Sequence, residues 1–184
     1  MDGDGRHQDG GTGRVVVGVS GSPGSLAALH LGVAEARRRG AVLVPVLAWE
    51  PPGGEYGYRR SPCPPLLSAA REAAGQRLRD ALDAAFGGAD PGVPLHPTVF
   101  RGEPGPALVA AADRPADLLV LGRSGGLLRR GFRRPVAAYC AGRAGCPVLA
   151  APVPGLLHDL EALHRRTRWH LPVGPVPGLL GPRG

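Results

Sequence analysis

Two adjoining stretches decide the fold, Arg14-Val-Val-Val-Gly-Val19 and Ser20-Gly-Ser-Pro-Gly-Ser25. The first is a short run rich in β-branched residues, which predicts a buried strand. The second has the composition of a turn, and the apolar residues after it recur at helical spacing. That helix is expected to end at Arg37-Arg38-Arg39 and Gly40, because cations suit the last helical turn and glycine suits a left-handed cap. The folded part of the chain therefore begins with a strand, a loop and a helix.

The same alternation continues to residue 151. Further strands are predicted over residues 41–48, 93–100, 117–121 and 147–151, and further helices over residues 66–86, 104–112 and 135–143. Continuously apolar strands that alternate with helices indicate a parallel sheet. We expect an α/β fold, a doubly wound five-stranded parallel sheet with helices on both faces. Ligands of such sheets bind beyond the carboxyl ends of the strands, which here means the loops after Val19 and Leu121.

Composition indicates one globular domain with looser segments beside it. Of the 184 residues, 43% are hydrophobic, 20% charged and 4% aromatic, as is usual for a folded soluble domain. The chain also has 30 glycines and 21 prolines, and almost half of them gather in residues 1–13, 51–65 and 152–184. We therefore expect these three stretches to be loosely structured.

Sequence features also bear on the compartment. The longest apolar run, residues 41–49, is too short for a membrane span and contains Pro45. The first residues lack the basic start and apolar centre of a signal peptide. We expect a cytoplasmic protein with no membrane span and with its cysteines, Cys63, Cys140 and Cys146, as reduced thiols. The spacing of Cys140 and Cys146 does not suit a metal site, so we expect them to be small buried side chains.

The net charge of +7 comes from 22 basic residues, every one of them arginine. Such a composition is typical of a GC-rich genome as much as of a surface selected to bind phosphate. Nucleic-acid binding is further disfavoured because only three Phe, three Tyr and two Trp are available for base stacking. The cluster of Arg129, Arg130, Arg133 and Arg134 suits an acidic protein partner instead.

Four segments together resemble the universal stress protein family. They are Val15-Val-Val-Gly-Val-Ser-Gly-Ser22, Arg101-Gly-Glu-Pro104, Asp117-Leu-Leu-Val-Leu-Gly122 and Cys146-Pro-Val-Leu149. The resemblance implies strand order 3-2-1-4-5 and a domain over residues 14–152. We expect a flexible segment before it, residues 1–13, and a C-terminal extension after it, residues 153–184, with a short helix and then a disordered tail. The resemblance also implies a homodimer through the fifth strand, Pro147 to Ala151, and an uncovered edge strand favours such pairing physically.

The resemblance further implies a site for ATP or another adenine nucleotide. The family's ATP-binding members carry Gly-x2-Gly-x9-Gly-(Ser/Thr) after the fourth strand, where glycines let the backbone approach phosphates. The first half is present as Gly122-Arg123-Ser124-Gly125, but the Gly-(Ser/Thr) pair is absent. One alignment places Pro135 and Val136 there, and the other places Arg134 and Pro135 there. Proline offers neither an N–H nor a hydroxyl, which weakens the phosphate cradle, although Arg123 or Arg134 could supply charge.

Two other positions bear on the adenosine part of the ligand. Nucleotide-binding members commonly have an aspartate after the first strand, where this chain has Ser20, and they pack adenine where this chain has Leu47 and Ala48. Both loops also have structural interpretations, a strand-to-loop turn at Gly122 and a helix N-cap with Pro23 in the first turn. The candidate nucleotide-binding residues are Val19, Ser20, Gly21, Ala48, Gly122, Arg123, Ser124, Gly125, Pro135 and Val136.

Catalytic apparatus is not visible in the sequence. His-Glu-x-x-His, Gly-x-Ser-x-Gly and paired acidic motifs on strand ends are all absent. The chain is therefore interpreted as a binding or regulatory module and not as an enzyme. Two hypotheses stay open: a universal stress protein-like module that binds an adenine nucleotide weakly, or a dimeric module that binds a protein partner through an arginine-rich surface and holds no nucleotide.

Overall fold

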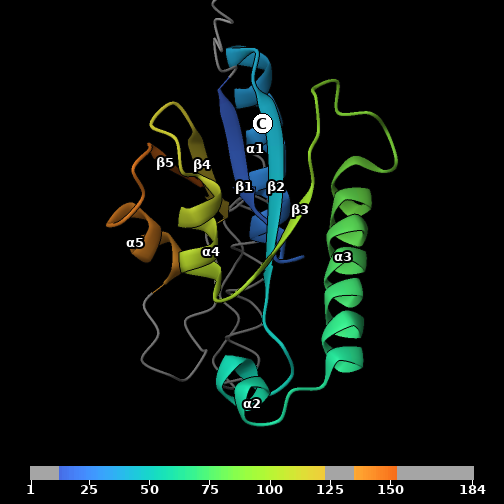
Figure 1. Ribbon diagram of the computed structural model, residues 1–184. Helices are drawn as coiled ribbons and strands as arrows, with labels where there is room; N and C mark the ends of the chain where they lie inside the picture. The colour runs from blue at the N-terminus through green and yellow to red at the C-terminus, as the bar shows by residue number, and fades with distance from the viewer. Residues whose placement is uncertain (1–12, 123–134, 153–184) are drawn as a thin grey trace, which may run out of the picture.

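Five parallel strands form the sheet in the order β3-β2-β1-β4-β5 (Figure 1), as expected. The computed structural model describes residues 13–122 and 135–152. The strands are β1 (Arg14–Gly18), β2 (Val42–Trp49), β3 (Thr98–Arg101), β4 (Leu118–Gly122) and β5 (Val148–Ala151). β1 lies at the centre, where Val16 pairs with Val44 of β2 and with Leu119 of β4. The order of strands reverses at β1, so the switch point lies between β1 and β4.

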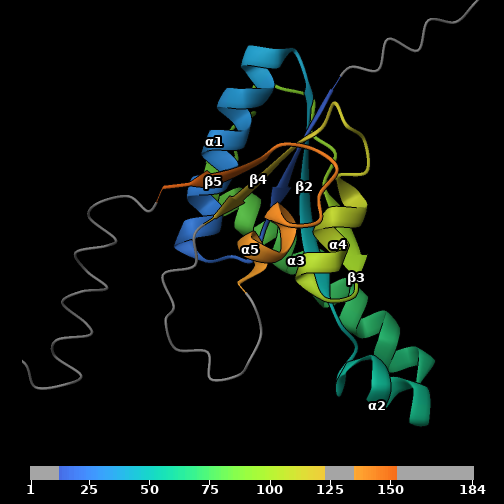
Figure 2. The same ribbon diagram turned by 90° about the vertical axis from the view of Figure 1, so that its left-hand side faces the viewer.

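Helices cover both faces of the sheet. α1 (Pro23–Arg39) and α3 (Pro64–Phe86) pack on one face, and α4 (Pro104–Ala111) and α5 (Val136–Ala141) pack on the other. Figure 2 shows α1 and α4 on opposite sides of the strands. A further helix, α2 (Gly54–Arg60), lies below the carboxyl ends of the strands in Figure 1 and buries none of its residues.

The alternation of side chains along β1 divides the interior into two cores. Val15 and Val17 join the core beneath α1 and α3, whereas Val16 joins the core beneath α4 and α5. All three valines are fully buried, which explains why the strand reads as continuously apolar. Gly32 allows α1 to lie close to β1. A Cβ at this position would be only 2.5 Å from Cγ2 of Val17.

The ends of α1 agree with the sequence. Ser22 is its N-cap and accepts a hydrogen bond from the amide of Ser25, and Pro23 stands in the first turn. Gly40 ends the helix with φ of 61°, after the three arginines of the last turn. A left-handed residue at this position is favourable only for glycine, so the local sequence alone predicts this boundary.

The structure differs from the sequence prediction in one additional helix and in several element boundaries, among them those of α5, which spans Val136–Ala141 and not residues 135–143. Residues 51–65, which we expected to be loose, contain α2 and the first turn of α3, which begins at Pro64 and not at residue 66. The strand predicted over residues 93–100 is shorter, because β3 begins at Thr98 and an isolated bridge at Leu95 precedes it. Pro94 and Pro97 supply no N–H to a ladder, which accounts for the interruption.

The structure does not describe residues 1–12, 123–134 and 153–184. The expected flexible N-terminal segment and the expected C-terminal helix and tail therefore lie outside the described residues. Among the helices that the structure does describe, none has the length and apolar character needed to cross a membrane.

Candidate functional site

The candidate site lies at the carboxyl edge of the three adjacent strands β2, β1 and β4. Val19 continues the pairing of β1 beyond Gly18, because its amide donates to the carbonyl of Val46 over 2.8 Å. Its side chain is buried, whereas Ser20 and Gly21 are exposed. Ala48 is half-buried near the end of β2 and pairs with Phe100 of β3. The fold thus brings Val19 to Gly21, Ala48 and Gly122 to one edge of the sheet.

Gly122 ends β4 in direct contact with the start of α1. A Cβ at Gly122 would lie 2.2 Å from the carbonyl oxygen of Gly24 and 2.7 Å from the amide nitrogen of Ser25. Backbone atoms cannot give way as the end of a flexible side chain can. Glycine is therefore required here for packing, whether or not a ligand approaches, and the end of β4 meets the start of α1 at the switch point.

The serines after β1 stabilise the start of α1. The hydroxyl of Ser22 accepts from the amide of Ser25 over 3.3 Å, and the carbonyl of Ser22 accepts from the Ser25 hydroxyl over 2.8 Å. The hydroxyls of Ser20 and Ser22 lie 2.9 Å apart. The N-cap interpretation of this segment is confirmed. Ser20 contributes a neutral hydroxyl, and no carboxylate stands at this point of the chain.

Pro135 and Val136 lie at the start of α5. Pro135 is exposed and is the N-cap of that helix without a side-chain hydrogen bond, and Val136 is 37% exposed. α5 is held against α4 because Gly105 leaves room for the ring of Tyr139, whose Cδ1 would lie 2.7 Å from a Cβ there. The remaining predicted site residues, Arg123, Ser124 and Gly125, fall outside the described residues, as does the predicted partner-binding cluster of Arg129, Arg130, Arg133 and Arg134.

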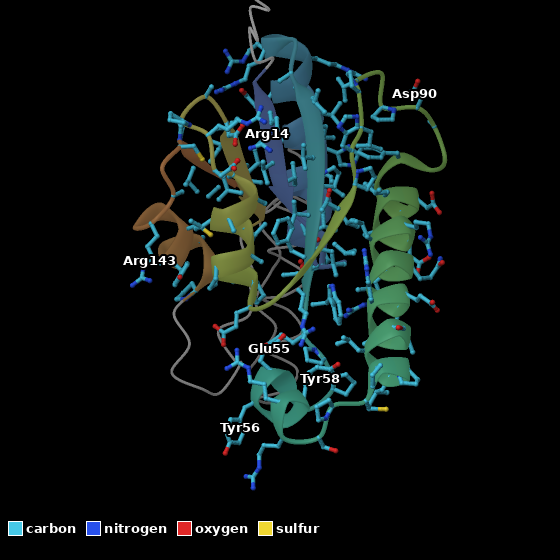
Figure 3. The ribbon with its side chains drawn as sticks, in the orientation of Figure 1. Arg14, Glu55, Tyr56, Tyr58, Asp90 and Arg143 are labelled. Carbon is cyan, nitrogen blue, oxygen red and sulfur yellow. The ribbon has the colours of Figure 1, made fainter. Side chains whose placement is uncertain are left out.

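An ion pair that sequence reasoning missed fixes α2 at the same edge. Arg101, the last residue of β3, donates from Nε and Nη2 to the carboxylate of Glu55 over 2.7 and 3.0 Å. Its guanidinium also lies 4.8 Å from the ring centre of Tyr58. These hydrogen bonds hold the pKa of Glu55 below its ordinary value. Figure 3 shows Glu55 and Tyr58 on α2, at the end of the sheet opposite to Arg14.

The charged cluster around Arg14 belongs to the amino edge of the sheet. Arg14 donates to both carboxylate oxygens of Asp117, over 3.0 and 2.5 Å, and to Asp113. The side chain of Asp117 is fully buried and also accepts from the amide of Arg114. A buried carboxylate needs such partners, so this cluster ties β1 to β4 and has a structural role.

The prediction that Cys140 and Cys146 are small buried side chains is confirmed, because both belong to the core that α4 and α5 cover. Cys63 is exposed. Burial raises the pKa of the Cys140 and Cys146 thiols, which disfavours reactive thiolates. Within the described ranges, no group of three or more His, Cys, Asp or Glu side chains could hold a metal ion.

The strand order, with helices on both faces of the sheet, defines a doubly wound α/β domain. Its family is shown by sequence: a model of the Universal stress protein family matches residues 11–152, so the chain belongs to that family. A comparison with curated proteins gave no match.

Solved structures of universal stress proteins share the fold. One, in complex with cAMP, is 28% identical with a TM-score of 0.51 and covers 78% of this chain and 98% of its own. Another, from Burkholderia pseudomallei, is 26% identical with a TM-score of 0.51, and the match covers 77% of this chain and 96% of that protein. The UspA protein of Lactobacillus plantarum is 20% identical with a TM-score of 0.53, covers 77% and 98%, and supports the fold alone.

Proposed function

We propose that this protein is a non-catalytic regulatory module that binds an adenine nucleotide at the carboxyl edge of β2, β1 and β4, mainly through the adenosine. The observation that carries the proposal is the convergence of residues 19–21, Ala48 and Gly122 on three adjacent strand ends. Support comes from the 28% identical universal stress protein whose structure is a complex with cAMP, because this chain covers nearly all of that protein.

Recognition of the phosphates is expected to be weak. Ser20 brings no charge to the end of β1, and Pro135 has neither an N–H nor a hydroxyl to offer. The loss of two hydrogen bonds to a charged phosphate, each worth about 1.5–3 kcal/mol, lowers affinity by roughly two to four decades. Triphosphate, diphosphate and monophosphate forms should therefore bind with similar, modest affinity.

Calorimetric titration of the purified chain with ATP, ADP, AMP and cAMP tests this proposal. We expect measurable binding of all four and no marked preference for ATP. Tight binding of ATP alone, at micromolar dissociation constants or below, would show an intact phosphate site. If none of the four bound, and freshly purified protein retained no nucleotide, the nucleotide function itself would be wrong.

Two single substitutions decide which residues stand at the incomplete half of the phosphate motif. Pro135→Ser restores an N–H and a hydroxyl at one aligned position, and Val136→Ser restores the hydroxyl at the other. Only the variant at the true motif position should strengthen ATP binding, while AMP binding should change little. If each variant changed the affinities for ATP and for AMP by the same factor, neither residue would lie near the phosphates that ATP has and AMP lacks.

A second candidate function is a dimeric module that binds a protein partner and holds no nucleotide. The observation that favours it is the edge strand β5, which in the described part of the chain pairs with β4 only. Val148 and Leu149 on this strand are half-buried and Ala150 is exposed. A second copy could pair with this edge. Dimerisation without nucleotide binding would support this candidate over the first.

A further inference from the structure

Glu50 is the residue that follows β2 directly, at the same carboxyl edge as the proposed nucleotide site. β2 ends at Trp49, whose carbonyl still accepts from the amide of Gly102 over 2.7 Å. The backbone at Glu50 is thus held in register with the neighbouring strand. The side chain is half-buried, and removing a carboxylate from water costs free energy unless a partner hydrogen-bonds to it.

The alternation along β2 places Glu50 on the α4 side of the sheet. Leu47 and Trp49 belong to the core beneath α1 and α3, whereas Val46 belongs to the core beneath α4 and α5. Ala48 pairs with Phe100, which packs on the second core as well. Since side chains alternate with a period of two, Glu50 continues the row of Val46 and Ala48, about 6.6 Å beyond Ala48. That spacing is on the scale of one nucleoside.

The carboxylate of Glu50 has no partner of its own in the described part of the protein, in which it forms neither an ion pair nor a hydrogen bond. Glu55 is the next acidic residue along the chain and lies at the same edge, but its carboxylate forms an ion pair with Arg101. A carboxylate is an acceptor only, and two of its lone pairs match two neighbouring hydroxyl donors.

We propose that Glu50 binds the ribose hydroxyls of the nucleotide and so selects ribonucleotides over deoxyribonucleotides. An acidic side chain beyond a strand of a doubly wound sheet, next to the loop of the first strand, has the right chemistry for a 2′-hydroxyl. The inference rests on the proposed function, because it assumes that adenosine lies beside Ala48. It adds a residue that discriminates between sugars.

The test is a titration of the full chain with AMP, 2′-deoxy-AMP and 3′-deoxy-AMP. Hydrogen bonds to a charged acceptor predict that the unmodified protein binds AMP about 10- to 100-fold more tightly than either deoxy form. Glu50→Ala removes both acceptors and should bring the ratio of affinities near one. Glu50→Gln keeps one neutral acceptor and should give an intermediate ratio. A change in folding alone would weaken all three ligands equally and leave the ratio unaltered.

Glu72→Ala is the matched control, because Glu72 is exposed on α3, which packs on the opposite face of the sheet. This variant should keep the ratio of the unmodified protein. If the unmodified protein binds AMP but Glu50→Ala leaves the ratio unchanged, the role of Glu50 is wrong and the proposed function stands. If EDTA alone abolishes the preference, Glu50 holds a cation instead. If AMP does not bind at all, both proposals fail.

Discussion

Gly122 illustrates how one residue can suit a ligand and a packing contact together. The sequence motif predicts a glycine that lets a phosphate approach, yet the atoms nearest to its missing Cβ are the backbone atoms of Gly24 and Ser25. The packing requirement is present without any nucleotide. A glycine in a motif therefore does not by itself show that a ligand binds.

The first prediction concerns this contact. Gly122→Ala should destabilise the domain by about 1–3 kcal/mol, because the added methyl group overlaps backbone atoms that must move. Gly145→Ala is the matched control, since a Cβ at Gly145 would meet nothing within 4 Å. Urea unfolding followed by circular dichroism measures both. Equal stability of the two variants would contradict the close approach of β4 and α1.

A second prediction concerns the carboxylate of Asp113 and the pH dependence of stability. The hydrogen bond from Arg14 holds the pKa of Asp113 below its ordinary value of 3.8. A lowered pKa stabilises the folded state fully above about pH 4, and this contribution is lost as the pH falls through the folded value. Asp113→Asn should therefore reduce the fall in urea midpoint between about pH 7 and pH 3.

Asp83→Asn is the control for this pH series, because Asp83 is exposed on α3 and forms no ion pair within the described residues. The control should follow the curve of the unmodified protein. Curves of the same shape for Asp113→Asn and the unmodified chain would show that the ion pair with Arg14 contributes nothing measurable in solution.

At the scale of elements, the sequence predicts whatever depends on neighbours in the chain. The strand-loop-helix order, the N-cap at Ser22 and the left-handed end at Gly40 are all set by local composition and were predicted correctly. α2 was missed because its two glycines and the prolines before and after it indicate a loop, while Arg101, which binds Glu55 of α2, lies 46 residues further along the chain. Pairing over such a separation leaves no periodic signal along the chain.

The same limit applies to the candidate site. Motif matching identified Gly122 and the residues after β1, which the structure does bring to one edge with Ala48. It did not identify Glu50, because the significance of that residue comes from its half-burial and its lack of a partner among the described residues. Both are properties of the packed structure. The only signal in the sequence is an acidic residue directly after a buried strand.

The third prediction tests whether the ion pair holds α2 in place. Glu55→Gln removes the charge that Arg101 binds, and α2 has no buried residue to replace that interaction. Amide hydrogen exchange over residues 54–61 should rise severalfold while exchange in β1 and β4 stays slow, because a weakly packed element opens locally. The Glu72→Gln control should leave exchange in α2 unaltered. Slow exchange in α2 of Glu55→Gln would show that other contacts position it.

For the whole molecule, the asymmetry of the sheet edges determines where a second copy could bind. β3 lies at one edge and packs against α3, whereas β5 lies at the other edge with Ala150 exposed. The carbonyl of Pro147 accepts from the amide of Leu119 over 2.9 Å, so this carbonyl points toward β4. Backbone groups alternate in direction along a parallel strand. Val148 and Ala150 therefore present theirs to the open edge.

The last prediction follows from that alternation. If the domain dimerises by pairing β5 with a second copy, Val148→Pro removes an outward N–H while the inward bonds to β4 remain, and proline is tolerated on an edge strand. The mass of this variant should shift from dimer to monomer at protein concentrations of about tens of micromolar, with its circular dichroism unchanged. Val148→Ala keeps the N–H and should stay dimeric, and Ala150→Pro should repeat the loss at the next outward residue. A monomeric mass for the unmodified chain at these concentrations would refute pairing through β5, and a dimer that survived both proline variants would place the interface elsewhere.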